Sequence, residues 1–169
     1  DVVRVASHCT EADITERHIS YAREKGKQVY GVLMMSHMAS KETLAEEALK
    51  MESYGAQGVI LMDSAGAYLQ KDVTEKVSAL ASALTIPVGF HAHNNLGLSV
   101  ANSVAAAEAG AMIIDGSARG FGAGAGNTPI ELLIGVFERL GFATGVDLYH
   151  ILDASDIAEK ELMKILPFP

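Results

Sequence analysis

Two histidines, two positions apart, carry the clearest chemical signal in the sequence. His91 and His93 stand at the end of an apolar run, residues 88–93, that is typical of a β-strand. Side chains alternate between the faces of a strand, so both imidazoles point to one side and can reach one divalent ion. Two ligands do not complete a metal site, and the pair alone is equally consistent with ordinary hydrogen-bonded histidines.

A glycine-rich stretch, residues 120–127, is the second candidate for chemistry. Gly120, Gly122 and Ala125 fit a loose dinucleotide-binding pattern, which makes a nicotinamide or flavin site an alternative. The pattern follows the fifth predicted strand rather than the first, and no further strand is evident to complete its βαβ unit. A flexible loop is the simpler interpretation. A third is that the side-chain carbonyl of Asn127 faces the same ion as the two histidines.

Polar residues also end the other predicted strands. Asp63 is favoured as a turn or cap residue over a catalytic base, whereas the hydroxyl of Ser64 could donate to a substrate carboxylate. His8 and His37 are interpreted as hydrogen-bonded rim residues. Cys9 beside His8 suggests a nucleophile, but neighbouring side chains on an extended segment point apart.

The elements that must position these residues form a repeat. Apolar runs at residues 2–6, 29–34, 59–63, 88–93 and 112–115 start roughly 24 to 30 residues apart, the length of one strand and one crossover helix. Helical spacing fills the intervals, with four predicted apolar stripes: Leu44, Ala48 and Met51; Val73, Val77, Leu80 and Leu84; Leu98, Ala101, Ala105 and Ala109; and residues 130–140.

Capping signals mark where these helices begin. Asp13 and Glu16 form a capping-box pattern for a helix over 14–25, and Ser40 can cap the next helix. Thr128 is the predicted N-cap of the helix over 130–140, with Pro129 at its first position. A further helix is expected from Asp147, with a second start near residue 155, and residues 166–169 are expected to end the chain.

Five βα units in succession indicate a parallel sheet in a single domain over residues 1–169. An open doubly wound sheet and an incomplete (β/α)₈ barrel both accommodate them. Length favours the open sheet, because a full barrel needs about 250 residues. The polar groups after every strand favour part of a TIM barrel, whose active sites lie at the carboxyl ends of the strands.

Composition narrows the class of protein. The formal net charge of −8 and the lack of a Lys/Arg cluster argue against nucleic-acid binding and anionic membrane surfaces. Cys9 is the only cysteine, which suits a reducing compartment, and we find neither a signal peptide nor a membrane span, so a cytoplasmic location is expected. The chain starts at Asp1 without a methionine, which suggests a processed or truncated product.

Several stretches together resemble the 4-hydroxy-2-oxovalerate aldolases, which belong to a superfamily of metal-dependent barrels similar to HMG-CoA lyase. The resemblance covers essentially the whole chain, and the stretches that carry it are residues 4–13 (RVASHCTEAD), 33–38 (LMMSHM), 63–66 (DSAG), 91–98 (HAHNNLGL) and 122–127 (GAGAGN). The first two look particular to the aldolases, whereas the others are shared with sister enzymes.

The resemblance implies a (β/α)₈ barrel that cleaves 4-hydroxy-2-oxoacids into pyruvate and an aldehyde, using Mn²⁺ or alternatively Mg²⁺ or Co²⁺. His91 and His93 match two of three protein ligands, Ser64 matches a residue near the pyruvate moiety, and Asn127 matches a position that reaches the metal in sister lyases. The family's catalytic Arg, its Asp ligand and its base His are expected upstream of Asp1, and a later Tyr beyond Pro169. The chain is therefore expected to be an internal fragment covering about five strands.

Three hypotheses follow. The first is a pyruvate aldolase acting on 4-hydroxy-2-oxovalerate in the meta-cleavage catabolism of aromatic compounds, with an acylating acetaldehyde dehydrogenase as the partner that the resemblance implies. The second is a sister acyl-CoA lyase or synthase. The third is a non-catalytic barrel fragment that forms homo-oligomers through its open strand edges.

Overall fold

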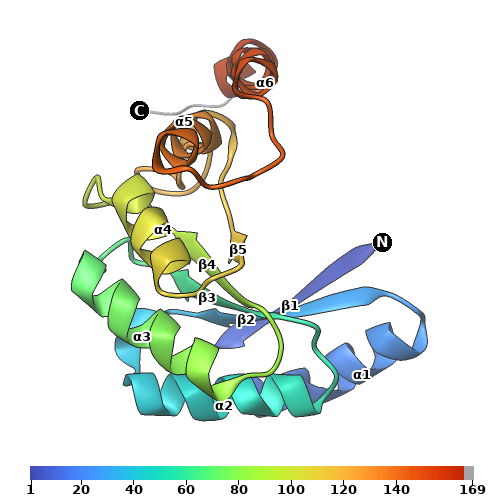
Figure 1. The fold of residues 1–169 in the computed structure, drawn as a ribbon. Coiled ribbons are helices and arrows are strands. Elements are labelled where there is room, and N and C mark those ends of the chain that lie inside the picture. Colours follow the sequence, from blue (N-terminus) through green and yellow to red (C-terminus); the bar gives the residue numbers. More distant parts are fainter. Residues whose placement is uncertain (166–169) are drawn as a thin grey trace.

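The computed structural model describes residues 1–165, which form a curved sheet of five parallel strands with helices along its outer side (Figure 1). The strands are β1 (Val2–His8), β2 (Gln28–Met34), β3 (Val59–Asp63), β4 (Val88–Ala92) and β5 (Ile113–Ile114). They pair in the order of the sequence, each with its neighbour. A doubly wound sheet would require a reversal of strand order. The structure is therefore part of a barrel, and the open-sheet alternative is excluded.

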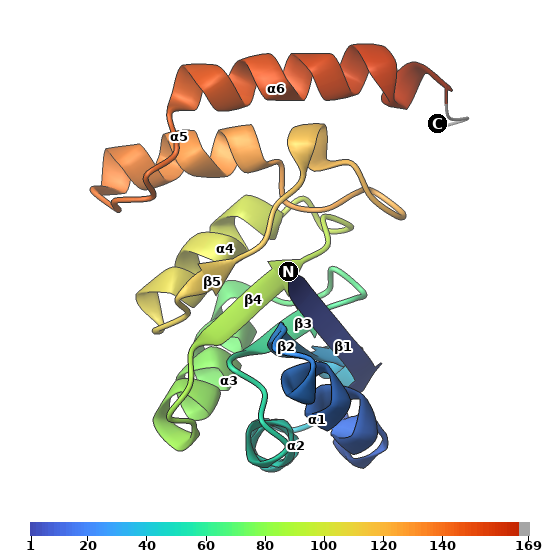
Figure 2. The same cartoon turned by 90° about the vertical axis from the view of Figure 1, so that its right-hand side faces the viewer.

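Within residues 1–165, six α-helices connect or follow the strands: α1 (Glu16–Glu24), α2 (Lys41–Ser53), α3 (Gln70–Ala83), α4 (Ser99–Glu108), α5 (Ile130–Leu140) and α6 (Leu148–Glu161). Single turns of 3₁₀ helix occur at η1 (Ala12–Thr15), η2 (Ser36–Met38), η3 (Ala118–Gly120) and η4 (Met163–Ile165). Helix α6 packs on α5, at the opposite end of the molecule from α1 and α2 (Figure 2). Within the described residues, no helix is long and apolar enough to cross a membrane.

The core lies between the outer face of the sheet and the helices. Leu61 and Phe90 pair across β3 and β4, and both are fully buried on this face. The predicted stripes of α2 and α3 are confirmed, since their side chains are buried in the same cluster: Leu44, Ala48, Met51, Val73, Val77, Leu80 and Leu84. Burial of these side chains fixes the register of each helix on the sheet.

The predicted stripe of α4 is only partly confirmed: Ala105 lies in the core and Ala109 packs against it, whereas Leu98 and Ala101 are not among the buried residues of the helix. Its buried residues are Ser99, Asn102, Ser103, Ala105 and Ala106, so the buried face is rotated and mostly polar. Hydrogen bonding explains the difference. The Asn102 amide donates to the Tyr68 carbonyl at 2.7 Å, and the Ser103 hydroxyl lies 3.1 Å from the hydroxyl of Thr128.

Of the predicted single-residue helix N-caps, one is confirmed and one is wrong. Ser40 accepts a hydrogen bond from the Thr43 amide at 3.2 Å, so this predicted cap is confirmed. The helix expected from Asp147 is also present, and Asp147 is its N-cap, accepting from the His150 amide at 2.9 Å. Thr128 is not the cap of α5, because its hydroxyl is bonded to Ser103; Pro129 holds the N-cap position.

Two further helix boundaries differ from the prediction. The capping box of Asp13 and Glu16 does not form: Asp13 lies in η1, and α1 begins without a side-chain cap. Helix α6 is continuous through Ser155, where a second start was expected. The expected chain end at 166–169 lies outside the described residues.

Replacing Leu44 by alanine tests the packing of α2 on the sheet. Leu44 is fully buried, so Leu44→Ala should lower the free energy of unfolding by about 2 to 5 kcal/mol through lost apolar burial and the cavity left behind. Urea denaturation monitored by circular dichroism measures the loss. Leu49→Ala on the same helix is the matched control, because Leu49 is 42% exposed. Equal losses in the two variants would contradict the observed register of α2.

Candidate metal centre

The strand register places both histidines on the concave face of the sheet. Leu61 and Phe90 form a pair that faces the helices, so the next pair, Met62 and His91, faces the opposite way. His93 follows two residues later on the same side, and the centroids of the two imidazole rings are 5.3 Å apart. The predicted common orientation of His91 and His93 is therefore present at the carboxyl end of β4.

Backbone and side-chain hydrogen bonds join three loops around His93. The His93 amide donates to the Asp63 carbonyl at 3.3 Å. The Asn95 side chain donates to the Ala65 carbonyl at 2.9 Å and accepts from the Ala125 amide at 3.0 Å. Asn95 thus links the loop after β3 to the glycine-rich stretch, with the histidine segment between them.

Asn127 reaches the same region through a backbone bridge with His93. Its side-chain amide donates to the Phe121 carbonyl at 2.9 Å, and its carbonyl oxygen, Oδ1, is buried without a hydrogen-bond partner in the part of the chain that the structure describes. A β-carbon at Gly122 would lie 2.4 Å from the Asn127 nitrogen, so only glycine leaves room for this side chain. A buried oxygen without a donor is costly, and a cation is one group that would satisfy it.

The electrostatics of the site centre on Asp115. Its carboxylate accepts from Arg4 at 2.5 and 2.8 Å and lies 3.1 Å from Nδ1 of His91. Burial on its own would raise the pKa of Asp115, but the hydrogen bonds with His91 and Arg4 outweigh burial and lower the pKa to about 2. The side chain is therefore an ionised, acceptor-only partner for His91.

The surroundings of His93 favour the neutral ring. Burial lowers the pKa of His93, and the neighbouring His91 lowers it further, while a hydrogen bond to the backbone of Ala123 acts in the opposite direction. Neutral imidazole is the form that binds a metal ion. Together with the unsatisfied oxygen of Asn127, the two rings form a donor set that fits a divalent ion.

Asp63 and Ser64 have different roles. Asp63 is fully buried, and its carboxylate accepts from the amides of Ala67 and Tyr68 at 3.1 and 2.9 Å, as expected for a turn residue. The Ser64 hydroxyl oxygen accepts from the Met35 amide at 2.9 Å. Ser64 lies directly after β3, which pairs with β4, and within residues 1–165 no acceptor takes its own hydroxyl proton.

The glycine-rich stretch does not resemble an anion cradle. The amides of Gly120 and Asn127 donate to the Ser117 and Gly120 carbonyls, and the Gly126 amide donates to Ala123. These amides are unavailable to a pyrophosphate, and α5 is followed by α6 rather than by a strand within the described chain. Both observations disfavour the dinucleotide alternative.

Of the remaining strand-end candidates, His8 and Cys9 make local contacts. His8 hydrogen-bonds through Nδ1 to the Thr10 hydroxyl at 2.9 Å. The Cys9 thiol donates to the Met35 carbonyl at 3.3 Å, and burial raises its pKa, so the nucleophile reading loses support. Nδ1 of His37 is buried and has no partner among residues 1–165.

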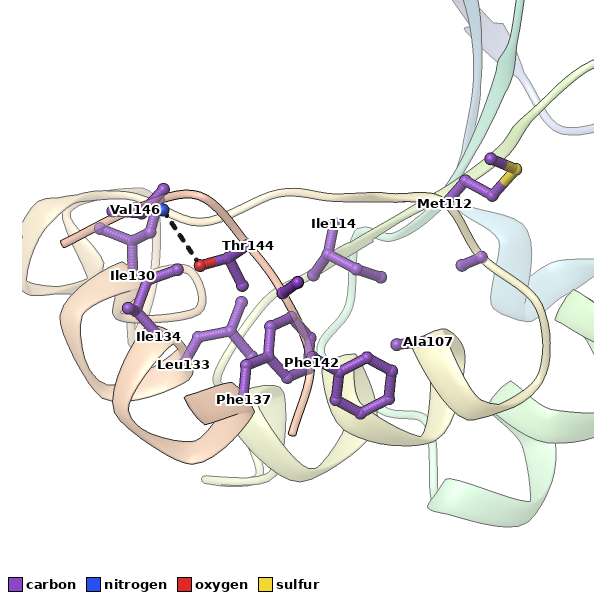
Figure 3. Close-up of a pocket in the computed structure, with 12 residues that line it drawn as sticks. Ala107, Met112, Ile114, Ile130, Leu133, Ile134, Phe137, Phe142, Thr144 and Val146 are labelled. Atoms are coloured by element: carbon purple, nitrogen blue, oxygen red, sulfur yellow. Dashed lines mark hydrogen bonds between the residues drawn. The ribbon is translucent and has the colours of Figure 1, made fainter. Parts of the chain in front are cut away.

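An apolar pocket of about 360 Å³ lies away from these groups, between β5, α4, α5 and the segment 142–146 (Figure 3). Ile114 contributes to its wall; this residue pairs with Phe90 and so faces the helix side of the sheet, opposite to His91. None of the twelve lining residues is titratable. The pocket is therefore separate from the candidate metal centre.

Residues 5–158 match the model of the HMGL-like family, and the chain belongs to this family. Its fold is similar to that of an HMG-CoA lyase from Bacillus subtilis, with a TM-score of 0.86 at 21% identity, covering 99% of this chain and 65% of that one. It is also similar to the N-terminal domain of a putative aldolase from Bacteroides vulgatus, with a TM-score of 0.83 at 26% identity, covering 99% of this chain and 56% of the other.

More specifically, the chain is similar to curated 4-hydroxy-2-oxovalerate aldolases, as its sequence motifs predict. It is 67% identical to the aldolase of Spirochaeta aurantia and 64% identical to that of Pectobacterium atrosepticum, each over 167 residues. In both cases the match covers 99% of this chain and 49% of the relative. The chain thus spans about half the length of the curated relatives it matches.

Sequence reasoning gave no role to three residues that shape this site: Arg4, Asn95 and Asp115. Asp115 ends the fifth predicted strand and so belongs to the polar groups found there, but its sequence context does not indicate a partner. Its pairing with Arg4 joins positions 111 residues apart, so spacing offered no signal. Within the described chain, no three His, Cys, Asp or Glu side chains form a cluster that could hold a metal ion, so the donors present are the two histidines and the Asn127 oxygen.

The low pKa of Asp115 predicts how stability depends on pH. Because the folded pKa of about 2 lies below the unfolded value of about 3.9, the contribution is fully present above pH ~4 and is lost as pH falls toward ~2. The full shift corresponds to roughly 2 to 3 kcal/mol. Unfolding free energies from pH 2 to 7 should fall less steeply in acid for Asp115→Asn than for the wild type. Parallel profiles would contradict this assignment, and Asp1→Asn, an exposed carboxyl, is the control.

Proposed function

We propose that the protein forms the metal-binding part of a pyruvate aldolase that cleaves 4-hydroxy-2-oxovalerate into pyruvate and acetaldehyde. The observation that carries the proposal is that His91 and His93 share one face at the carboxyl edge of a parallel sheet, with Asn127 bridged to His93 through the backbone and its side-chain oxygen unpartnered among residues 1–165. This is the edge at which barrel enzymes place their active sites. Identities of 52% to 67% with proteins named as this aldolase support the choice of reaction.

Three side chains of the chain are the proposed metal ligands. His91 and His93 would hold Mn²⁺, or alternatively Mg²⁺ or Co²⁺, with Asn127 as a further oxygen donor. When bound, the ion supplies Lewis-acid chemistry, drawing electron density from the 2-oxo group as the bond between C3 and C4 breaks. Further ligands would come from outside the described residues.

Ser64 is the proposed contact for the substrate carboxylate. Its oxygen is held by the Met35 amide, which leaves its hydroxyl proton to donate toward a carboxylate oxygen. Cleavage also requires a base that removes the proton of the 4-hydroxyl group. We assign no such base within residues 1–165.

The product suggests the biological setting. Acetaldehyde is a reactive product, which favours transfer to an acylating acetaldehyde dehydrogenase as a partner. The proposed role is in the meta-cleavage catabolism of aromatic compounds, in the cytoplasm. The buried free thiol of Cys9 is compatible with a reducing compartment of this kind.

Metal binding provides the first test. His91→Ala and His93→Ala should each lower the affinity for Mn²⁺ at least about tenfold, because each removes one ligand. Isothermal titration calorimetry measures the affinity. His18→Ala is the matched control, since His18 is exposed on α1, away from the site, and should leave binding unchanged. A wild-type protein that fails to bind Mn²⁺ would refute the metal assignment.

Substrate binding provides the second test. In a protein that also carries the segment supplying the base, Ser64→Ala should raise the KM for 4-hydroxy-2-oxovalerate about 10- to 150-fold with a smaller effect on kcat, because a hydrogen bond to a charged group contributes about 1.5 to 3 kcal/mol. Pyruvate release is followed with lactate dehydrogenase and NADH. Ser82→Ala, at an exposed position on α3, is the control. An unchanged KM would remove Ser64 from the substrate site, and cleavage of an acyl-CoA instead would favour the sister lyases.

A further inference from the structure

We propose that Asp115, anchored by Arg4, is a positioning residue that fixes the ring of His91 with its Nε2 atom free to bind the metal ion. The inference rests on the proposed function for the identity of the ligand, a divalent cation. The orientation of the ring, by contrast, depends on contacts within this chain alone.

The strand register brings the carboxylate to the histidine. Phe90 pairs with Ile114, and the Asp115 amide donates to the Phe90 carbonyl at 3.0 Å. The next side chains, His91 and Asp115, therefore lie side by side on the concave face. Their contact between Nδ1 and Oδ2 measures 3.1 Å, and both side chains are largely buried, at 17% and 12% exposure.

Arg4 holds the carboxylate from the other edge of the sheet. It lies on β1, and its two terminal nitrogens contact the two oxygens of Asp115 at 2.5 and 2.8 Å. A bidentate contact of this kind fixes the plane of the carboxylate as well as its position. Asp115 therefore presents Oδ2 to His91 in one orientation.

The carboxylate determines which nitrogen of His91 carries the proton. An ionised carboxylate only accepts hydrogen bonds, so a neutral ring facing it must have its proton on Nδ1. The lone pair then resides on Nε2, which points away from Asp115. Carboxylates that hold histidine ligands in this way typically contribute 10- to 100-fold to metal affinity.

The tautomer of His91 is the direct readout. In the metal-free protein, at a pH alkaline enough for the imidazole to be neutral, long-range ¹H–¹⁵N spectra should show a protonated Nδ1 and an unprotonated Nε2 for His91. Asp115→Ala should convert this to a mixture of both tautomers, because the acceptor is gone. A wild-type His91 protonated on Nε2, or an unchanged tautomer in Asp115→Ala, would overturn the inference.

Metal affinity is the second readout. Asp115→Ala should weaken Mn²⁺ binding about 10- to 100-fold, and Arg4→Met should produce a smaller loss. Asp115→Asn, which retains an acceptor oxygen, should recover part of both the tautomer and the affinity, and it serves where Asp115→Ala does not fold. Asp1→Ala is the matched control, because it removes an exposed carboxylate that pairs with Lys27 at 2.6 Å and touches neither histidine.

The two readouts separate the inference from the proposed function. A protonated Nδ1 that depends on Asp115, in a protein that binds no Mn²⁺, would support the positioning role and refute the proposed metal. Weaker Mn²⁺ binding in Asp115→Ala with an unchanged tautomer would instead identify Asp115 as a ligand and overturn the positioning role.

Discussion

The common direction of five neighbouring strands is the constraint on which the site depends. Every strand pairs in parallel with its neighbour in sequence, so all carboxyl ends meet at one edge. The pleat then sorts side chains with a period of two, sending Leu61 and Phe90 into the core and His91 to the concave face. A shift of one residue in the register of β4 would bury the imidazoles among the helices and expose the phenyl ring. The register of β4 therefore determines both the packing of the core and the placement of the histidines.

The third candidate metal ligand, Asn127, lies outside the sheet. Asn127 belongs to a glycine-rich stretch whose shape is set by helix α6 as much as by β5. Arg119, just before this stretch, forms ion pairs with Asp156 and Glu159 on α6, and the buried carboxylate of Glu131 accepts from the Arg119 amide and the Ser155 hydroxyl. Asn95 ties the other side of the stretch to the loop after β3. The position of the Asn127 oxygen therefore depends on contacts from three parts of the chain.

Local patterns in the sequence were sufficient for the strands, the faces of α2 and α3, and the shared orientation of His91 and His93, because each depends on residues close in sequence. They failed where a polar side chain had a distant partner. Thr128 could not be recognised as bonded to Ser103, and the buried face of α4 follows from the contact between Asn102 and Tyr68. For Asn127 the sequence pattern left three interpretations open, and only the resemblance favoured a position near the metal. The pairing of Arg4 with Asp115 depends on how strongly the sheet curves, which no local pattern encodes.

Sequential strand pairing also has a consequence for the order in which the molecule can assemble. Each βα unit contacts mainly the unit before it, so the sheet can grow from β1 to β5 as the chain leaves the ribosome. The contact of Arg4 with Asp115 is different, since it closes a loop of 111 residues and requires the first and the fifth strand together. His91 consequently gains its contact with the Arg4–Asp115 pair only when the last strand has docked. A nascent chain would hold a nearly complete core before it holds a competent site.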